Sequence, residues 1–101
     1  MILVVNKRTF DGDGYYVGRP SPLGNPFPMK SEQDRDEVVA KYRVWLWKQI
    51  KERTAAYDEL VRLTDQYIRD GKLVLVCWCS PKRCHADVIK SAVFWLADNR
   101  K

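Results

Sequence analysis

The segment Cys79–Asp87 contains a serine hydroxyl, two cations, two thiols and the only histidine of the chain. An apolar run precedes it and a helical pattern follows, so a strand-to-helix junction is expected here. The open amides and positive dipole end of a first helical turn attract anions, and Lys82 and Arg83 add two full charges. We therefore predict an anion site that includes Cys79 and Pro81. No P-loop glycine pattern is present, so no particular nucleotide is indicated.

The same segment has residues that could support catalysis. A helix N-terminus beside basic side chains lowers the pKa of a cysteine, so Cys79 and Cys84 are both candidate nucleophiles. His85 could act as a general base or bind substrate, and Asp87 could orient a partner. Cys84, His85 and Asp87 are therefore the candidate catalytic residues. A hydrogen-bonded packing role is the alternative for a lone histidine on the apolar side of a helix.

Cys77, Cys79, Cys84 and His85 are also the residue types of a tetrahedral zinc site. Their spacing argues against such a site, because Cys84 and His85 as neighbours in a helix would project about 100° apart. Structural zinc sites favour two or more residues between paired ligands. Burial of small, semi-apolar thiols is a further alternative. No metal and no cofactor is predicted.

A second segment, Gly18–Phe27, has the composition of a rigid recognition loop. Its three prolines fix φ near about −65°, while Gly24 permits a close backbone approach or a positive φ. A conformation set beforehand lowers the ordering cost of binding. Arg19, Ser21 and Asn25 supply a donor fork, a hydroxyl and an amide, which together could hold a phosphate, a carboxylate or a nucleobase edge. A proline-stiffened loop without a ligand is the alternative.

Three apolar segments predict the strands. The runs Ile2–Val5 and Leu73–Trp78 are continuously apolar, as in strands buried on both faces. Tyr15–Val17 follows an Asp-Gly turn signal and is predicted to be a short strand that forms a hairpin with the first one.

Apolar residues at intervals of three and four predict the helices. The first should run from about Asp34 to Arg53, and the second should end where Asp70 meets Gly71, a residue suited to the C′ position. Ser80 and Pro81 read as the N-cap and first-turn pair of a third helix.

This order of elements predicts one α/β domain over residues 1–101. The expected fold is a small, Rossmann-like three-layer domain with a mostly parallel sheet, an N-terminal hairpin and about three helices. The two apolar strands should be central and parallel, joined by a crossover that contains two helices. Helices should cover both faces of the sheet.

Composition narrows the function classes. Apolar residues make up 46% and charged residues 31% of 101 residues, which is typical of a globular protein. No apolar run approaches the ~18 residues of a membrane span, and the N-terminus does not read as a signal peptide. Three cysteines, an odd number, argue against a disulfide scaffold, so a cytoplasmic location is expected. The net charge of +5 favours anionic ligands, but nucleic acid is disfavoured without a dense basic stripe.

The motifs YVGRPSPLGNPF at residues 16–27 and CWCSPKRCHADVI at residues 77–89 resemble those of the DUF4326 family. These are small uncharacterised domains common in bacteria and their phages. Arg35 also matches, and the likeness covers nearly the whole chain. Ala86 stands where the family pattern usually has glycine, and residues 28–34 diverge locally. The overall plan is similar to Rossmann-like nucleotide-binding domains, a likeness that implies a ligand class at fold level only.

These observations lead to one functional hypothesis. The loop at residues 19–27 and the junction at residues 79–87 are expected to form one pocket that binds, and could turn over, a nucleotide-like, phosphate-bearing ligand. Tyr16, Phe27 or Trp78 could stack on a base. The ligand-binding candidates are Gly18, Arg19, Ser21, Gly24, Asn25, Phe27, Arg35, Cys79, Pro81, Lys82 and Arg83.

The alternatives belong to other classes. The first is a protein-interaction module that binds a host protein through exposed aromatics such as Trp47, acting in the host cytoplasm if the chain is phage-encoded. A nucleic-acid-binding domain and a zinc-dependent domain are less favoured. No membrane partner is expected.

Overall fold

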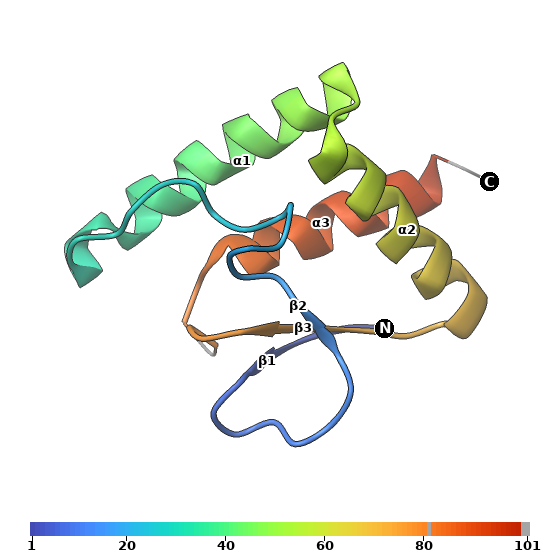
Figure 1. Cartoon of the computed structure of the whole chain (residues 1–101), viewed down its shortest axis with the longest axis horizontal. Helices are drawn as coiled ribbons and strands as arrows, with labels where there is room; N and C mark the ends of the chain where they lie inside the picture. The colour runs from blue at the N-terminus through green and yellow to red at the C-terminus, as the bar shows by residue number, and fades with distance from the viewer. Residues whose placement is uncertain (81, 100–101) are drawn as a thin grey trace.

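The computed structural model describes residues 1–80 and 82–99. The class is α/β with three helices, as predicted, and Figure 1 shows their arrangement. The elements are β1 (Ile2–Asn6), β2 (Tyr15–Tyr16), a short 3-10 helix η1 (Glu32–Asp34), α1 (Arg35–Glu52), α2 (Ala55–Asp70), β3 (Leu73–Cys77) and α3 (His85–Asp98).

The sheet has the order β1-β3-β2 and is parallel throughout. Ile2 of β1 lies opposite Leu73, and Tyr15 of β2 lies opposite Leu75. The crossover with two helices between β1 and β3 is confirmed. The predicted hairpin is wrong, because β2 pairs with β3 and not with β1.

The segment between β1 and β2 explains this difference. The chain leaves the end of β1, turns back across the sheet and enters β2 in the same direction as β1 (Figure 1). A Cβ atom at Gly14 would lie 2.7 Å from Val76 Cγ2 and 3.0 Å from Val74 Cγ1, so only glycine fits against β3 there. The Asp-Gly turn signal therefore belongs to a longer connection.

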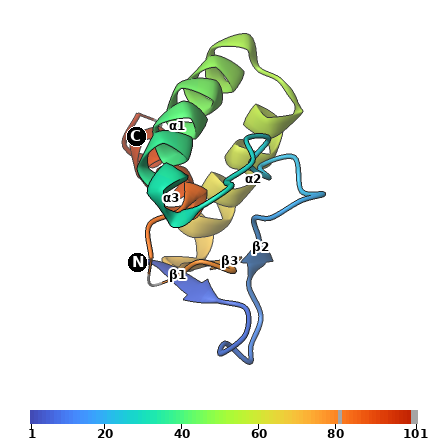
Figure 2. The same ribbon diagram turned by 90° about the vertical axis from the view of Figure 1, so that its left-hand side faces the viewer.

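All three helices lie on one side of the sheet (Figures 1 and 2). α2 and α3 pack on β3, and α1 packs on these two helices. The fold has a helical layer and a sheet layer instead of the predicted three layers, because the connection before β2 approaches the second face where a helix was expected. Leu3 on this open side stays 37% exposed.

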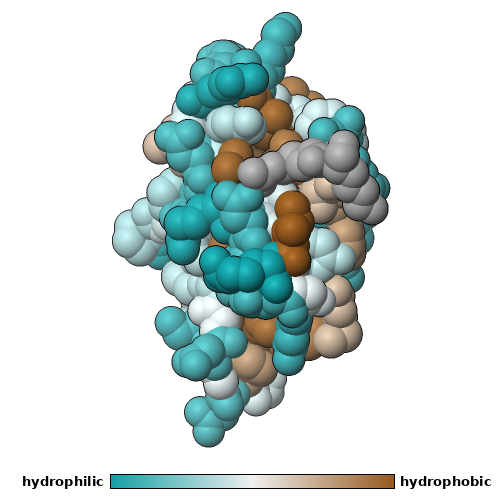
Figure 3. All heavy atoms as spheres, turned by 90° about the vertical axis from the view of Figure 1, so that its right-hand side faces the viewer, coloured by the Kyte–Doolittle hydropathy of each residue, from teal (hydrophilic) through white to brown (hydrophobic). Residues whose placement is uncertain are grey.

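The hydrophobic core lies between the sheet and the helices. Its largest fully buried side chains include Leu23, Tyr42, Leu60, Leu75 and Ile89. On the face in Figure 3 the surface is largely hydrophilic, with hydrophobic atoms in separate areas. None of the helices in the described chain is long and apolar enough to cross a bilayer.

The helix ends agree with the sequence except at α3. α1 ends before Arg53 (φ 56°), and α2 ends before Gly71 (φ 70°), the predicted C′ residue. α3 begins at His85 with Cys84 as its N-cap, so the prediction that Ser80 and Pro81 start this helix is wrong. Ser80 Oγ instead donates to the carbonyl of Val4 at 3.2 Å.

Candidate functional site

A cavity of about 210 Å³ lies between the proline-rich loop and the junction that precedes α3. Asn25 of the loop and His85 of the junction both line it. The two segments, far apart in sequence, therefore meet in space. The lining residues are Gly18, Arg19, Asn25, Phe27, Met29, Arg35, Val38, Val39, Cys79, Arg83, Cys84 and His85.

The loop wall is fixed by turns and by one buried anchor. The amide of Ser21 donates to the carbonyl of Gly18 at 2.9 Å, and the amide of Gly24 donates to that of Ser21 at 2.8 Å. Leu23 is fully buried, and its carbonyl accepts a 2.7 Å hydrogen bond from the Tyr42 hydroxyl. These contacts hold the loop in one shape before any ligand arrives.

Two predicted ligand-binding residues shape the loop without lining the cavity. Ser21 Oγ lies 2.6 Å from the Tyr15 hydroxyl and accepts a bond from the Leu23 amide at 3.2 Å. A Cβ atom at Gly24 would lie 3.0 Å from the Arg19 nitrogen and from the Ser21 carbonyl oxygen. The structure therefore supports a conformational role for Ser21 and Gly24.

Arg19 and Asn25 leave donor groups available at the cavity. Asn25 Oδ1 accepts from the Phe27 amide at 2.9 Å, and its Nδ2 amide makes no hydrogen bond within residues 1–80 and 82–99. Arg19 is exposed and has no acidic partner in the same residues. The loop therefore offers a free guanidinium and a free amide to a ligand.

Arg35 and the two junction cations, Lys82 and Arg83, are already paired with acids of η1 and α1. Arg35 Nε and Nη2 donate to both carboxylate oxygens of Glu32 at 3.0 and 2.9 Å. Lys82 Nζ lies 3.4 Å from Glu32, and Arg83 Nη1 lies 3.3 Å from Asp36. Hydrogen bonds from Arg35 lower the pKa of Glu32 to about 2. Much of the positive charge predicted here is therefore neutralised within the protein.

Arg35 also ties the first helix to the junction. Its Nη1 donates to the Arg83 carbonyl at 2.7 Å, and its guanidinium contacts the Cys79 side chain. Cys79 is half-buried and lines the cavity, whereas Lys82 is exposed and lies outside it. Pro81, predicted as a ligand contact, lies outside the described residues.

His85 is held by Val17, the residue that follows β2. Its Nε2 lies 2.8 Å from the carbonyl oxygen of Val17, and its ring packs edge-on against Tyr42 with centroids 5.1 Å apart. Burial lowers the pKa of His85, and the nearby charge of Arg19 lowers it further. Because a carbonyl only accepts, Nε2 carries the hydrogen and the neutral ring presents Nδ1 as an acceptor.

The other two candidate catalytic residues form the cap of α3. The Cys84 amide donates to Asp87 Oδ2 at 3.0 Å, and the Asp87 amide donates to the Cys84 side chain. A hydrogen bond with Cys77 and burial raise the pKa of the Cys84 thiol. Cys84 is only 5% exposed, so a reactive thiolate is disfavoured. These contacts support structural roles for Cys84 and Asp87.

Sequence reasoning missed part of the apolar wall and the acidic partners of the cations. Val38 and Val39 are buried and line the cavity from the first turns of α1. Met29 and Glu32 lie in the locally divergent stretch, where no pattern marked them. The ion pairs that Glu32 and Asp36 form with the junction could not be predicted from the sequence, because their partners are far apart in the chain and only the fold brings them together.

The remaining predictions concern metal and protein partners. Among the described residues, no group of three or more His, Cys, Asp or Glu side chains could hold a metal ion. Trp47 is half-buried and packs edge-on against Trp95, with ring centroids 5.0 Å apart. Val44, three residues before Trp47 in α1, is 72% exposed, and protein docking on this helix stays a prediction.

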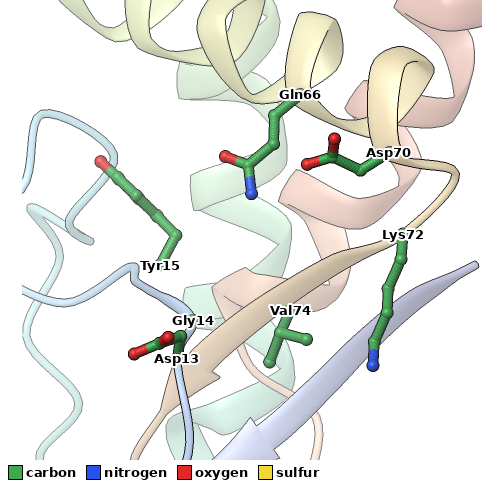
Figure 4. Close-up of a pocket in the computed structure, with 7 residues that line it drawn as sticks. All are labelled: Asp13, Gly14, Tyr15, Gln66, Asp70, Lys72 and Val74. Atoms are coloured by element: carbon green, nitrogen blue, oxygen red, sulfur yellow. The ribbon is translucent and has the colours of Figure 1, made fainter.

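A separate, larger cavity of about 530 Å³ lies between β2, β3 and the end of α2 (Figure 4). Gln66 and Asp70 extend from α2 toward it, and Lys72 lies at its far side. The Tyr15 hydroxyl points away from this space, toward the proline-rich loop. None of the predicted site residues lines this cavity.

Comparison with protein-family models gives a match that covers most of the chain. The model of the DUF4326 family, described as a domain of unknown function, matches residues 5–95. This range includes both walls of the smaller cavity. No curated protein and no solved structure matches the chain.

Proposed function

Because the chain belongs to the DUF4326 family, whose description assigns no function, we propose a function from the cavity itself. The protein binds a small phosphate-bearing ligand, a nucleotide or nucleotide derivative, between the loop at residues 19–27 and the start of α3. The observation that carries this proposal is that the unpaired Arg19, the free Asn25 amide and the first residue of α3 share one cavity.

The chemistry of these groups suits a phosphate. A guanidinium forms charge-assisted, bidentate hydrogen bonds with phosphate oxygens. The amide of His85, at the first position of a 14-residue helix, has no partner within that helix and lies at the positive end of its dipole. Nδ1 of His85 adds an acceptor for a ligand hydroxyl or amine. A ligand with both an anion and neutral polar groups would use all of them.

The size of the cavity limits how much of the ligand it encloses. At about 210 Å³ it is below the roughly 300–1,000 Å³ that is typical for drug-sized ligands. Phe27 and Val38 also line a neighbouring hollow of about 430 Å³. A phosphate and part of a sugar would therefore lie in the smaller cavity, while a base would stack on Phe27 toward this neighbouring hollow.

The geometry favours binding over turnover. Of the three candidate catalytic residues, Cys84 and Asp87 are engaged in the helix cap. Hydrolysis or glycosyl transfer needs a positioned nucleophile or a second acid or base beside His85. Arg83 and Cys79 also line the cavity, but neither supplies that nucleophile, acid or base. Arg83 is paired with Asp36, and the Cys79 side chain is in contact with Arg35.

Titration calorimetry with a panel of nucleoside mono-, di- and triphosphates and inorganic phosphate tests this proposal. We expect saturable binding of at least one nucleotide, weakened about 10- to 150-fold by Arg19→Ala through loss of a charge-assisted bond. Arg43→Ala, an exposed arginine of α1 outside the cavity, is the matched control and should bind normally. Absence of heat with every panel member, or equal weakening in both variants, would contradict the proposal.

A further inference from the structure

A cluster of aromatic and basic side chains lies on the open side of the sheet, away from the helices. Tyr16 is in register with Val76, and Trp78 follows Val76 in the alternation of β3, so both belong to the face that the helices leave open. Lys7 and Arg8 come directly after β1. We call Lys7, Arg8, Tyr16 and Trp78 the Trp78 platform.

The contacts within the Trp78 platform fix its shape. Trp78 Nε1 donates to the Tyr16 hydroxyl at 2.9 Å. Lys7 Nζ lies 4.5 Å from the centroid of the Tyr16 ring and 5.6 Å from that of Trp78, and the Arg8 guanidinium lies 5.8 Å from the Trp78 centroid. Trp78 nevertheless remains 51% exposed. A large indole is thus held in one orientation at the surface, half exposed, with the two cations over its ring.

We propose that the Trp78 platform binds single-stranded nucleic acid, with a base stacked on Trp78 and backbone phosphates on Lys7 and Arg8. Stacking on an exposed aromatic and phosphate contacts from flanking cations are how such strands are bound without sequence preference. Because the Tyr16 hydroxyl already orients the indole, little side-chain entropy is lost on binding. An acidic peptide would use the two cations but leave the indole without a stacking partner.

No run of basic residues in the sequence marks the Trp78 platform. Its four members come from three segments, residues 7–8, 16 and 78, which only the sheet order brings together. The platform residues do not line the cavity proposed for the phosphate-bearing ligand. The two proposals therefore stand or fall separately.

Fluorescence anisotropy with a labelled oligothymidylate of about 12 nucleotides at about 50 mM salt tests the proposal. We expect saturable binding whose log affinity falls with log salt at a slope of about −1.4, as two phosphate contacts on a single strand predict. Trp78→Ala should weaken binding roughly 5- to 150-fold, whereas Trp78→Phe, which keeps a stacking ring and the fold, should retain most of it.

A pair of charge reversals separates local contacts from net charge. Lys7→Glu with Arg8→Glu should abolish binding, while Arg43→Glu with Lys48→Glu, the same charge change on exposed residues of α1, should leave most of it. Arg19→Ala should bind the oligonucleotide normally. The proposal is overturned if no binding occurs, if Trp78→Ala binds like the parent, or if both double variants lose binding equally. Competition by poly-glutamate as strong as that by unlabelled oligonucleotide would also overturn it, in favour of an acidic protein partner.

Discussion

The two walls of the smaller cavity use their polar groups differently. In the proline-rich loop the backbone is tied down, by the buried Leu23 and the Tyr42 hydroxyl, while the side chains of Arg19 and Asn25 keep free donors. In the junction the charged side chains are paired, Lys82 with Glu32 and Arg83 with Asp36. Charge counted along the sequence therefore overstates the charge that a ligand can reach.

The two walls therefore have different roles. In the function we propose, the loop supplies recognition, because its free groups lie on a rigid backbone. The junction supplies position: Asp87 and Cys84 cap α3 and thereby place His85 at the cavity. Substitutions that remove an anchor should cost stability first, and substitutions of free groups should cost affinity alone.

The largest effect is expected from removing the loop anchor. Leu23→Ala deletes a fully buried side chain and should lower the free energy of unfolding by about 2–5 kcal/mol, measured by urea denaturation. Leu3→Ala, at a side chain that is 37% exposed, is the control and should cost less than about 1 kcal/mol. Equal costs at both positions would show that the loop is not anchored through Leu23.

A smaller effect is expected at the hydrogen bond that holds the same loop. Tyr42→Phe keeps the ring but leaves the buried Leu23 carbonyl unpaired, which should cost about 1–3 kcal/mol in the same denaturation assay. Tyr57→Phe serves as the control, because the Tyr57 hydroxyl has no hydrogen-bond partner within residues 1–80 and 82–99. If Tyr42→Phe lowers stability no more than Tyr57→Phe does, the hydrogen bond from Tyr42 does not hold the loop.

The junction wall can be tested at the cap of α3. Asp87→Ala should lower stability by about 0.5–2 kcal/mol, as loss of a capping side chain does, and Asp87→Asn should restore most of it by keeping an acceptor for the Cys84 amide. Nucleotide affinity of the folded Asp87→Asn variant should match that of the parent. A large affinity loss with stability intact would instead place Asp87 among the ligand contacts.

The smallest effect is expected for the acid titration of Glu32, the carboxylate that pairs with Arg35 and Lys82. Hydrogen bonds from Arg35 lower the pKa of Glu32 to about 2. A carboxyl pKa that is lower in the folded than in the unfolded chain stabilises the fold above the unfolded value, and this contribution is lost as pH falls from about 4.5 toward 2. Carboxyl carbon NMR should show this titration, and Arg35→Gln should move it back toward the ordinary range. An unchanged titration would mean that the pair does not form.

Local signals in the sequence predict most of the helices and strands, but they do not predict which strands pair with each other. The continuously apolar runs at β1 and β3 and Gly71 after α2 predict their own segments, and the structure agrees there. The Asp-Gly turn could not reveal whether the chain reverses tightly or crosses the sheet, so the hairpin was wrong.

The candidate site also combines features that the sequence predicts with contacts that only the fold shows. The two segments that line the smaller cavity could be selected from the sequence, because the proline loop and the helix start each have a distinctive local composition. Pairing of Glu32 and Asp36 with the junction, and of Trp78 with Lys7, joins residues that lie far apart in the chain. Ser80 was misplaced as an N-cap because a cysteine, which sequence rules do not favour at that position, caps α3 instead.

The central claim is that Arg19 and His85 face one phosphate-binding cavity, and NMR of the only histidine tests it most directly. Titration of the nucleotide panel should shift the His85 ring resonances saturably and raise the pKa of His85, because a bound phosphate favours the imidazolium. Arg19→Ala should weaken that response and Arg43→Ala should not. If no panel member moves the His85 resonances, the cavity does not bind a phosphate-bearing ligand and the account is contradicted.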